Sequence, residues 1–113
     1  MSLFRDSLAQ ATVVPETIQQ KIVNAFPDVP AGTIIAIAQC ESGLRQFYDD
    51  GSLVVSKTND VGVMQINMKS WKAKADEFGM DLTKTNDNIF FARYLYNLHG
   101  LSDWSMSKHC WAG

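Results

Sequence analysis

Apolar residues recur at helical spacing in the first third of the chain. Ile18, Ile22 and Phe26 follow one another at intervals of four, and prolines flank this segment at positions 15 and 27. An interval of four keeps side chains on one face of a helix, whereas proline is tolerated at a helix start and disrupts a helix interior. The pattern therefore predicts a first helix that Pro15 opens and Pro27 ends.

A second apolar stripe leads directly into an acidic residue. Pro30 opens this segment, Ile37 and Ala38 continue its apolar face, and Glu41 falls one turn further along the same face. Gly43 is a natural stop for this helix. A carboxylate in line with an apolar stripe is costly unless it is paired or its pKa is raised. The sequence therefore marks Glu41 as a candidate functional acid.

Residues 44–68 follow neither a helical nor a strand period. The turn pairs Asp50-Gly51 and Asn59-Asp60 alternate here with short β-branched pieces. This mixture predicts a long irregular loop with at most a small β-hairpin. Long ordered loops are usually functional, so the loop is a candidate part of the site.

Three helices are predicted after the loop. They cover residues 68–79 with Gly79 as the stop, residues 86–100 with Asp87 or Asn88 as the cap and Gly100 as the stop, and residues 104–111 with Asp103 as the cap. The predicted fold class is α+β and mostly α, with a small β-hairpin or long loop after the second helix. Residues 1–14 are predicted to form a poorly ordered arm, and residues 15–113 one domain.

Composition and charge narrow the classes of function. The chain has 113 residues, of which 46% are hydrophobic and 19% charged, as in an ordinary globular domain. Its net charge of −2, without a basic cluster, argues against nucleic acid as a partner. No apolar run approaches the roughly 18 residues of a membrane span. The start lacks the apolar run of a secretion signal, so we expect a mature or trimmed form or another export route.

Two cysteines, Cys40 and Cys110, leave three possibilities open. With His99 and His109 they make a Cys2His2 set, but the chain has neither a close cysteine pair nor an HxxxH spacing, so no metal site is expected. A disulfide is favoured over two free buried thiols. It would indicate an oxidising compartment.

Neutral polar groups follow the acid along the chain. Ser42 comes directly after it, and "GVMQIN" follows some twenty residues later. In that motif Gly62 permits a close approach of the backbone, Met64 offers an adaptable apolar wall, and Gln65 and Asn67 offer amide donors and acceptors. Amides, hydroxyls and aromatic rings around one carboxylic acid suit a sugar, which has many hydroxyls and apolar ring faces.

Together these motifs resemble those of a known family. The stretches "ES", "GVMQIN", "NIFFARYLYNL" and "DWSMS", with "AG" at the end, are similar to the catalytic domain of soluble lytic transglycosylases, in the small accessory form associated with secretion and conjugation systems. Goose-type lysozymes share the same lysozyme-like fold. The resemblance runs from about Ile18 to Gly113. It implies a lysozyme-like fold and peptidoglycan glycan strands as the substrate.

The resemblance also implies a reaction and a set of site residues. The β-1,4 bond between N-acetylmuramic acid and N-acetylglucosamine would be cleaved without a cofactor, with Glu41 as the single general acid and then the base. The muramic N-acetyl group is thought to assist, and the sugar's own 6-hydroxyl attacks, which gives a 1,6-anhydro product. The candidate substrate-binding residues are Ser42, Gln46, Gly62, Val63, Met64, Gln65, Asn67 and Tyr94.

Two other functions stay open beside transglycosylation. Goose-type lysozymes resemble the motif but carry an aspartate where this chain has Asn67, and an amide cannot act as a base on water. Hydrolysis is therefore disfavoured, although Asp49, Asp50 and Asp60 lie in the loop and are available to position a water. A lysozyme-like module that binds glycan without cleaving it is the third possibility, and Glu41 argues against it.

The chain departs from the family at its C-terminal end. Family members usually have an A-Y-N-A-G-like stretch whose tyrosine lies near the acid, whereas this chain reads "HCWAG", with Cys110 at the tyrosine and Trp111 at the asparagine. The resemblance thus places Cys110 near the helix of Glu41 and favours the Cys40–Cys110 disulfide. It further implies an extracytoplasmic monomer that works with a secretion or conjugation apparatus.

Overall fold

The structure is a computed structural model that describes residues 14–113. Its elements are α2 (Ile18–Ala25), α3 (Ala31–Ser42), β1 (Asp60–Val61), β2 (Ile66–Asn67), α4 (Met68–Glu77), α5 (Thr85–His99), the 3₁₀ helix η1 (Ser102–Ser107) and α6 (Lys108–Trp111). This mostly helical α+β architecture confirms the predicted fold class. The predicted N-terminal arm, apart from its last residue, lies outside the described residues.

Helix α2 begins three residues later than the sequence predicts. Thr17, and not Pro15, caps it: the Thr17 Oγ1 accepts a hydrogen bond from the Gln20 N–H at 3.1 Å, and the Gln20 Oε1 accepts one from the Thr17 N–H at 2.9 Å. This capping box satisfies amide groups that a helix start leaves without partners. Proline is permitted near a helix start but does not define it, which explains the misplaced boundary.

Helix α3 ends where the sequence predicts. Gly43 has a left-handed backbone with φ +71°, and its N–H donates to the Gln39 carbonyl at 2.9 Å. The Leu44 N–H donates to the Ala38 carbonyl at 3.2 Å, which completes a Schellman motif. Because the helix stops here, Glu41 lies in its last turn, next to the loop that follows.

The loop after α3 contains the small hairpin that the sequence predicts. Strands β1 and β2 pair antiparallel, with Asp60 opposite Asn67 and Val61 opposite Ile66. The β-branched piece around residue 54 forms only isolated bridges, such as the one between Val55 and Val61. The hairpin is therefore the last part of the long loop, and its second strand leads directly into α4.

Helix α5 begins at Thr85, so the residues predicted to cap it lie inside the helix. One of them, Asn88, is fully buried. Its Nδ2 donates to the carbonyls of Val61 and Leu82 at 2.9 Å each, and its Oδ1 accepts from the Met64 N–H at 3.0 Å. Asn88 thus anchors the hairpin turn from the core instead of capping the helix.

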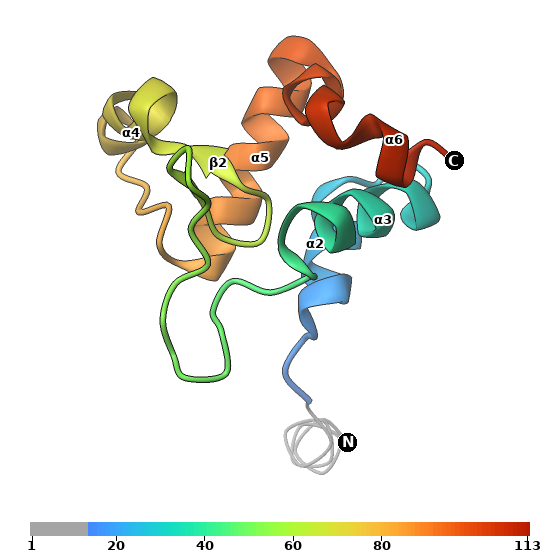
Figure 1. Ribbon diagram of the computed structural model, residues 1–113, viewed down its shortest axis with the longest axis horizontal. Helices are drawn as coiled ribbons and strands as arrows, with labels where there is room; N and C mark the ends of the chain where they lie inside the picture. The colour runs from blue at the N-terminus through green and yellow to red at the C-terminus, as the bar shows by residue number, and fades with distance from the viewer. Residues whose placement is uncertain (1–13) are drawn as a thin grey trace, which may run out of the picture.

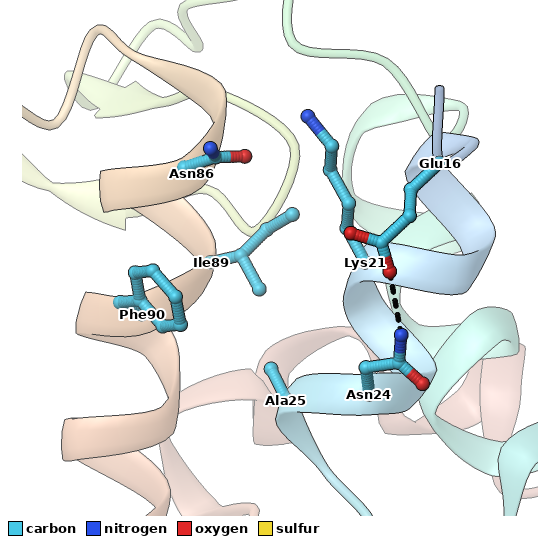
Figure 2. A pocket seen from close by; sticks show the side chains of 7 residues that line it. All are labelled: Glu16, Lys21, Asn24, Ala25, Asn86, Ile89 and Phe90. Atoms are coloured by element: carbon cyan, nitrogen blue, oxygen red, sulfur yellow. Dashed lines mark hydrogen bonds between the residues drawn. The ribbon is translucent and has the colours of Figure 1, made fainter. Parts of the chain in front are cut away.

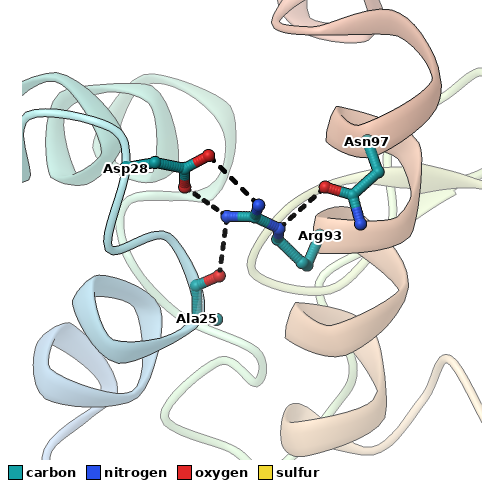
Figure 3. A network of polar contacts seen from close by, with 4 residues as sticks. All are labelled: Ala25, Asp28, Arg93 and Asn97. Carbon is teal, nitrogen blue, oxygen red and sulfur yellow. Dashed lines mark hydrogen bonds and ion pairs between the residues drawn. The ribbon is translucent and has the colours of Figure 1, made fainter.

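A surface ion pair ties α5 to the segment between α2 and α3 (Figure 3). Arg93 of α5 forms a two-pronged ion pair with Asp28, its Nη1 donates to the Ala25 carbonyl at 3.3 Å, and its Nε donates to Asn97 at 2.9 Å. The guanidinium also lies over the Tyr96 ring, 5.1 Å from its centre. The hydrogen bond from Arg93 holds the pKa of Asp28 below its ordinary value.

The predicted last helix is broken into η1 and α6. Trp104 has a non-helical backbone with φ −108° and ψ 15°. Its ring is buried, and its Nε1 donates to the Met64 carbonyl at 2.8 Å. Asp103 does not cap a helix, because its Oδ2 pairs with the His99 Nδ1 at 2.8 Å. The tertiary contact of Trp104 overrides the continuous helix that local signals predict.

The core lies where α2, α3, α5 and the hairpin turn meet. Its largest fully buried side chains include Phe26, Phe91, Ile22, Ile34, Ile37, Met64, Ile66 and Leu95. Figure 1 shows α6, in red, crossing beside α3, in teal, while α4 and the hairpin lie on the other side of the molecule around α5. Both α2, near the N-terminal end of the described chain, and α6, at its C-terminal end, thus pack against α3, the helix that carries Glu41.

Candidate active site

Glu41 is half-buried in the last turn of α3. Its Oε2 accepts a hydrogen bond from the Ser107 hydroxyl at 2.5 Å. Burial raises the pKa of Glu41, the hydrogen bond from Ser107 opposes that shift, and the negative charge of Asp60 adds to it, so the net pKa lies above the ordinary value. A carboxyl that keeps its proton to higher pH is suited to general-acid chemistry.

Ser107 is held by the C-terminal segment on its other side. The Trp111 Nε1 lies 3.1 Å from the Ser107 Oγ and 3.2 Å from the Trp104 carbonyl oxygen. The Ser107 Oγ itself lies 3.1 Å from that same carbonyl. Residues of η1 and α6 therefore hold the Ser107 hydroxyl in position to donate to Glu41. The sequence analysis missed this contact, since Ser107 is separated from Glu41 by 66 positions.

A disulfide joins α3 to α6 beside this contact. Cys40 and Cys110 are bonded with their Cα atoms 6.1 Å apart and 70 positions apart in the chain. This confirms the predicted bridge and excludes both thiols from the Cys2His2 alternative. Cys40 precedes Glu41 and Cys110 precedes Trp111, so the covalent link lies next to the residues that hold the acid in place.

Ser42 connects α3 to the hairpin turn. Its hydroxyl lies 2.8 Å from the Val63 carbonyl oxygen and 3.1 Å from that of Ala38, and it accepts from the Arg45 N–H at 3.2 Å. The shorter distance favours donation to Val63, because one hydroxyl carries one proton. Ser42 thus links the last turn of α3 to the hairpin turn, and its direct contact with a sugar stays a prediction.

Two buried amides support the hairpin turn from beneath. The Gln46 Oε1 accepts from the Val63 N–H at 2.8 Å, and its Nε2 donates to the Leu82 carbonyl at 3.2 Å. Gly62 has φ +77°, and a Cβ there would lie 2.3 Å from the Asn88 Nδ2 and 2.5 Å from the Gln46 Oε1. Only glycine lets both amides approach the turn this closely.

This arrangement changes the roles predicted for four residues. Gln46 is 2% exposed, Val63 and Met64 are fully buried, and Gly62 is buried as well. The backbone and side-chain groups described above already bind other parts of the protein. We therefore correct the sequence-based expectation: these residues support the site from below the surface instead of lining it. Residue type alone did not distinguish the two roles, because an amide serves either one.

Asn67 organises the loop around the hairpin. Its Oδ1 accepts from the Ser70 N–H at 2.9 Å as the cap of α4, while its Nδ2 donates to the Asp60 Oδ1 at 2.9 Å and to the Thr58 carbonyl at 3.0 Å. Both amide hydrogens of Asn67 are therefore engaged within the protein. Its structural role is established by these bonds, and direct contact with a sugar stays a prediction.

Asp60 is a second carboxylate whose charge acts on Glu41. Its Oδ2 accepts from the Ser56 hydroxyl at 2.8 Å and the Thr58 hydroxyl at 2.5 Å. Burial opposes its ionisation, but the hydrogen bonds from Thr58, Asn67 and Ser56 outweigh burial and bring the pKa of Asp60 below its ordinary value. Glu41 thus keeps its proton to a higher pH than Asp60 does, a difference that separates their chemical roles.

A small hollow of about 60 Å³ is lined by Asp60, whereas Glu41 is not among its lining residues. Gln65 lies at its edge with an unusual positive φ of 54°, and its Nε2 donates to the Gly62 carbonyl at 2.9 Å. The other lining residues are Asp60, Ile66, Asn67, Trp71, Leu95, Asp103 and Trp104. Carboxylates, amides and indole rings are groups that bind the hydroxyls and ring faces of sugars, although a hollow of this volume accepts a part of a sugar and not a whole ring.

A comparison with known families agrees with this geometry. The family described as Transglycosylase SLT domain matches residues 21–104, which is most of the chain. The chain belongs to this family. Searches among curated proteins and among solved structures gave no significant match. An SLT domain indicates peptidoglycan as the substrate, and within residues 14–113 no helix is long and apolar enough to cross a membrane.

The family match ends at Trp104. Ser107, Cys110 and Trp111 therefore lie beyond the matched residues of this SLT domain. The contact that holds Glu41 in place thus comes from a segment that the family match does not cover. This agrees with the departure from the family pattern in "HCWAG".

Tyr94 lies in an aromatic cluster between α4 and α5 of the SLT domain. The centre of its ring is 5.0 Å from that of Phe78, in an edge-on arrangement, and 5.3 Å from that of Phe91. Trp71 joins the cluster through Phe91 at 5.9 Å. Packing accounts for Tyr94 in this position, among the rings of α4 and α5 and not among the polar groups around Glu41. Its contact with substrate stays a prediction.

A separate hollow lies between α2 and α5 (Figure 2). Glu16, Lys21 and Asn24 lie on one side and Ile89 and Phe90 on the other, and the Glu16 carboxylate accepts from the Asn24 amide at 2.6 Å. It shares no lining residue with the hollow beside Asp60. Of the two carboxyl groups considered for cleavage chemistry, Asp60 lines the other hollow, and neither Asp60 nor Glu41 lines this one.

Proposed function

We propose that this SLT domain is a lytic transglycosylase with Glu41 as its single general acid and base. The bond cleaved is the β-1,4 link between N-acetylmuramic acid and N-acetylglucosamine, and the products end in 1,6-anhydro-N-acetylmuramic acid. The observation that carries the proposal is the half-buried Glu41 carboxyl, whose pKa is raised by burial at the end of α3. It occupies the acid position of the "ES…GVMQIN" motif.

The reaction uses the Glu41 carboxyl twice, first as an acid and then as a base. Glu41 donates this proton to the glycosidic oxygen as the bond from that oxygen to C1 breaks, and positive charge develops at C1. The muramic N-acetyl group assists at C1, and the 6-hydroxyl of the same sugar then attacks C1. The hydroxyl proton passes to the Glu41 carboxylate, which regenerates the acid. No water is consumed.

Asn67 supports transglycosylation over hydrolysis. An amide cannot deprotonate water, and the hydrogen bonds to Ser70, Asp60 and Thr58 hold it in the framework of the loop. Gln65 and Asn67 are the two predicted substrate-binding residues that line the hollow, and we propose Gln65 as the one that binds the sugar. We place the enzyme outside the cytoplasm, as a monomer beside a secretion or conjugation apparatus, and the disulfide fits that oxidising location.

The product ends test the reaction directly. After digestion of purified peptidoglycan, mass spectrometry is expected to find muropeptides ending in 1,6-anhydro-N-acetylmuramic acid, one water lighter than the hydrolytic products. Reduction with borohydride should leave these ends unchanged, because they have no reducing group. Products that are all reducible would contradict transglycosylation, and an inactive wild-type protein that still binds glycan would favour the binding module.

Asp60 makes hydrolysis the second candidate function. An ionised carboxylate near a protonated one is the pair that retaining and inverting glycosidases use. In that case Asp60 would activate water or attack C1, and the products would carry reducing ends. In a transglycosylase the same charge stabilises the positive charge that develops at C1.

Replacement of Asp60 with asparagine tests its role. We expect Asp60→Asn to lower turnover on the order of tenfold to a hundredfold, because an ionised group near developing positive charge is lost. Since the charge of Asp60 raises the pKa of Glu41, the variant should lose activity at lower pH than the wild type as the pH rises. Turnover and pH profiles measured with a soluble glycan substrate check both effects.

The matched control for this variant is Asp50→Asn. Asp50 lies in the same loop, is exposed, and accepts hydrogen bonds from the Ser52 N–H and hydroxyl at 2.9 and 2.6 Å. Its variant should keep the wild-type rate and pH profile. Equal behaviour of the two variants would remove Asp60 from the reaction.

A further inference from the structure

The C-terminal segment brings a hydroxyl to Glu41 from beyond the residues of the family match. We propose that Ser107, held by Trp111, is a positioning residue that decides which oxygen of Glu41 carries the proton given to the substrate. The inference rests on the proposed role of Glu41 as the acid. It concerns how that acid is oriented.

The hydrogen bonds around Ser107 fix its direction of donation. An indole N–H is only a donor, so the Ser107 Oγ accepts from the Trp111 Nε1 at 3.1 Å. The single hydroxyl proton then has two acceptors within reach, the Glu41 Oε2 at 2.5 Å and the Trp104 carbonyl at 3.1 Å. The shorter distance favours Glu41, and a carboxylate is also the stronger acceptor. Ser107 therefore donates to the Oε2.

This donation leaves the other oxygen of Glu41 for the acidic proton. An oxygen that accepts from Ser107 acts as the carbonyl oxygen of the neutral acid, so the proton of Glu41 resides on Oε1. A general acid has to present its proton toward the leaving oxygen. After the proton has gone, the same donation stabilises the carboxylate that next takes the proton of the 6-hydroxyl. Ser107 thus serves both halves of the proposed reaction.

The segment that carries Ser107 is held at several points. Trp104 is 2% exposed and anchored to the Met64 carbonyl at 2.8 Å, and Cys110 is bonded to Cys40. These ties fix η1 against the hairpin turn and α6 against α3 without using Glu41. The hydroxyl is therefore preorganised before substrate binds.

The Ser107 contact also bears on the departure from the family pattern at Cys110. The resemblance puts a tyrosine near the acid at the position of Cys110, which here is used for the disulfide. The structure assigns the hydroxyl contact to Ser107, three positions upstream, and the stabilising N–H to Trp111.

Replacement of Ser107 with alanine tests this role through the pH profile. The Ser107 hydrogen bond lowers the pKa of Glu41, so its loss should raise that pKa further. Because the acid must be protonated, the alkaline limb of the kcat profile should move to higher pH in Ser107→Ala. We also expect kcat to fall by about tenfold or more, with KM changed less than about twofold, since the lost contact acts on the reacting group.

Conservative variants separate positioning from packing. Ser107→Thr keeps the hydroxyl and should show the alkaline limb of the wild type. Trp111→Phe keeps most of the ring but removes the N–H that holds Ser107. It should move the alkaline limb in the same direction as Ser107→Ala does, but by less. Ser105→Ala, which changes an exposed serine of the same 3₁₀ helix, should match the wild type. Asp60, the charged group that acts on Glu41, is present in all of these variants, so its effect on the pKa of Glu41 is the same in each.

A titration without substrate keeps the inference separate from the proposed function. The carboxyl carbon of Glu41, followed by carbon-13 NMR against pH, should titrate higher in Ser107→Ala than in the wild type, whether or not either protein cleaves glycan. An unchanged Glu41 titration would overturn the inference. A wild-type protein that cleaves nothing, with the titration shifted as expected, would overturn the proposed function alone.

Discussion

Replacing Glu41 with glutamine is expected to abolish peptidoglycan cleavage while the domain stays folded. Glutamine has nearly the same shape and can still accept from Ser107, but it has no proton to donate to the glycosidic oxygen. General acid catalysis typically contributes on the order of 10²–10⁴-fold, and here one residue would act as both acid and base, so we expect a loss of at least about 10³-fold. Release of soluble muropeptides from purified peptidoglycan measures it.

The stability of this variant has a predicted sign. The pKa of Glu41 is raised in the folded state, so its favourable contribution is fully present below the unfolded pKa and is lost as the pH rises through the folded pKa. Above the folded pKa the ionised, half-buried carboxyl therefore costs stability, and at such a pH Glu41→Gln should melt at the same or a higher temperature than the wild type. In acid, where Glu41 is neutral, this advantage should disappear.

The control for Glu41→Gln is Glu77→Gln. Glu77 is exposed at the end of α4 and pairs with Lys74 at 3.1 Å. Its replacement should leave cleavage unchanged. Retained turnover in Glu41→Gln would remove Glu41 from its proposed role, and equal losses in both variants would indicate damage unrelated to the acid.

Removal of the disulfide is expected to have the largest effect on stability. The bond between Cys40 and Cys110 closes a loop of 70 positions, and the chain-entropy account assigns such a loop about 4 kcal/mol. The variant with both cysteines replaced by alanine should lose stability on that order, which is a large share of the total for a small domain. Denaturant unfolding, with and without a thiol reductant, measures the loss.

The same variant should lose activity before it loses its fold. The disulfide holds α6 against α3 beside Glu41 and Trp111, so its removal should loosen the segment that carries Ser107. The wild type in reductant should behave like the double variant, and the double variant should not respond to reductant. Equal unfolding midpoints for the wild type and the double variant under oxidising conditions would contradict a stabilising bridge.

Much of the helical architecture was predictable because its signals are local. The apolar spacing and Gly43 located α3 and the position of Glu41 at its end, since a helix stop depends on one residue that adopts a left-handed backbone. The loop and its small hairpin followed from turn residues in the same way. The start of α2 was misplaced because Thr17 and Gln20 cap it together, and the prediction considered only Pro15.

The roles of buried amides were not predictable from residue type. Gln46 and Asn88 carry the same chemical groups as a sugar-binding amide, yet both point into the core and hold the hairpin turn. Asn88 was expected at a helix cap because asparagine favours caps. Its burial depends on where α5 packs against the turn, which no local pattern states.

The sequence by itself determined most of the helices, the acid at the end of an apolar stripe, and the family motifs that point to peptidoglycan. The tertiary structure alone decided how that acid is held, since Ser107 reaches Glu41 across 66 positions. It also decided that three hydrogen bonds lower the pKa of the nearby Asp60. The physical reason is that periodicity and capping act between near neighbours in the chain. The pKa and orientation of a carboxyl depend on burial and on donors that only the folded chain brings together.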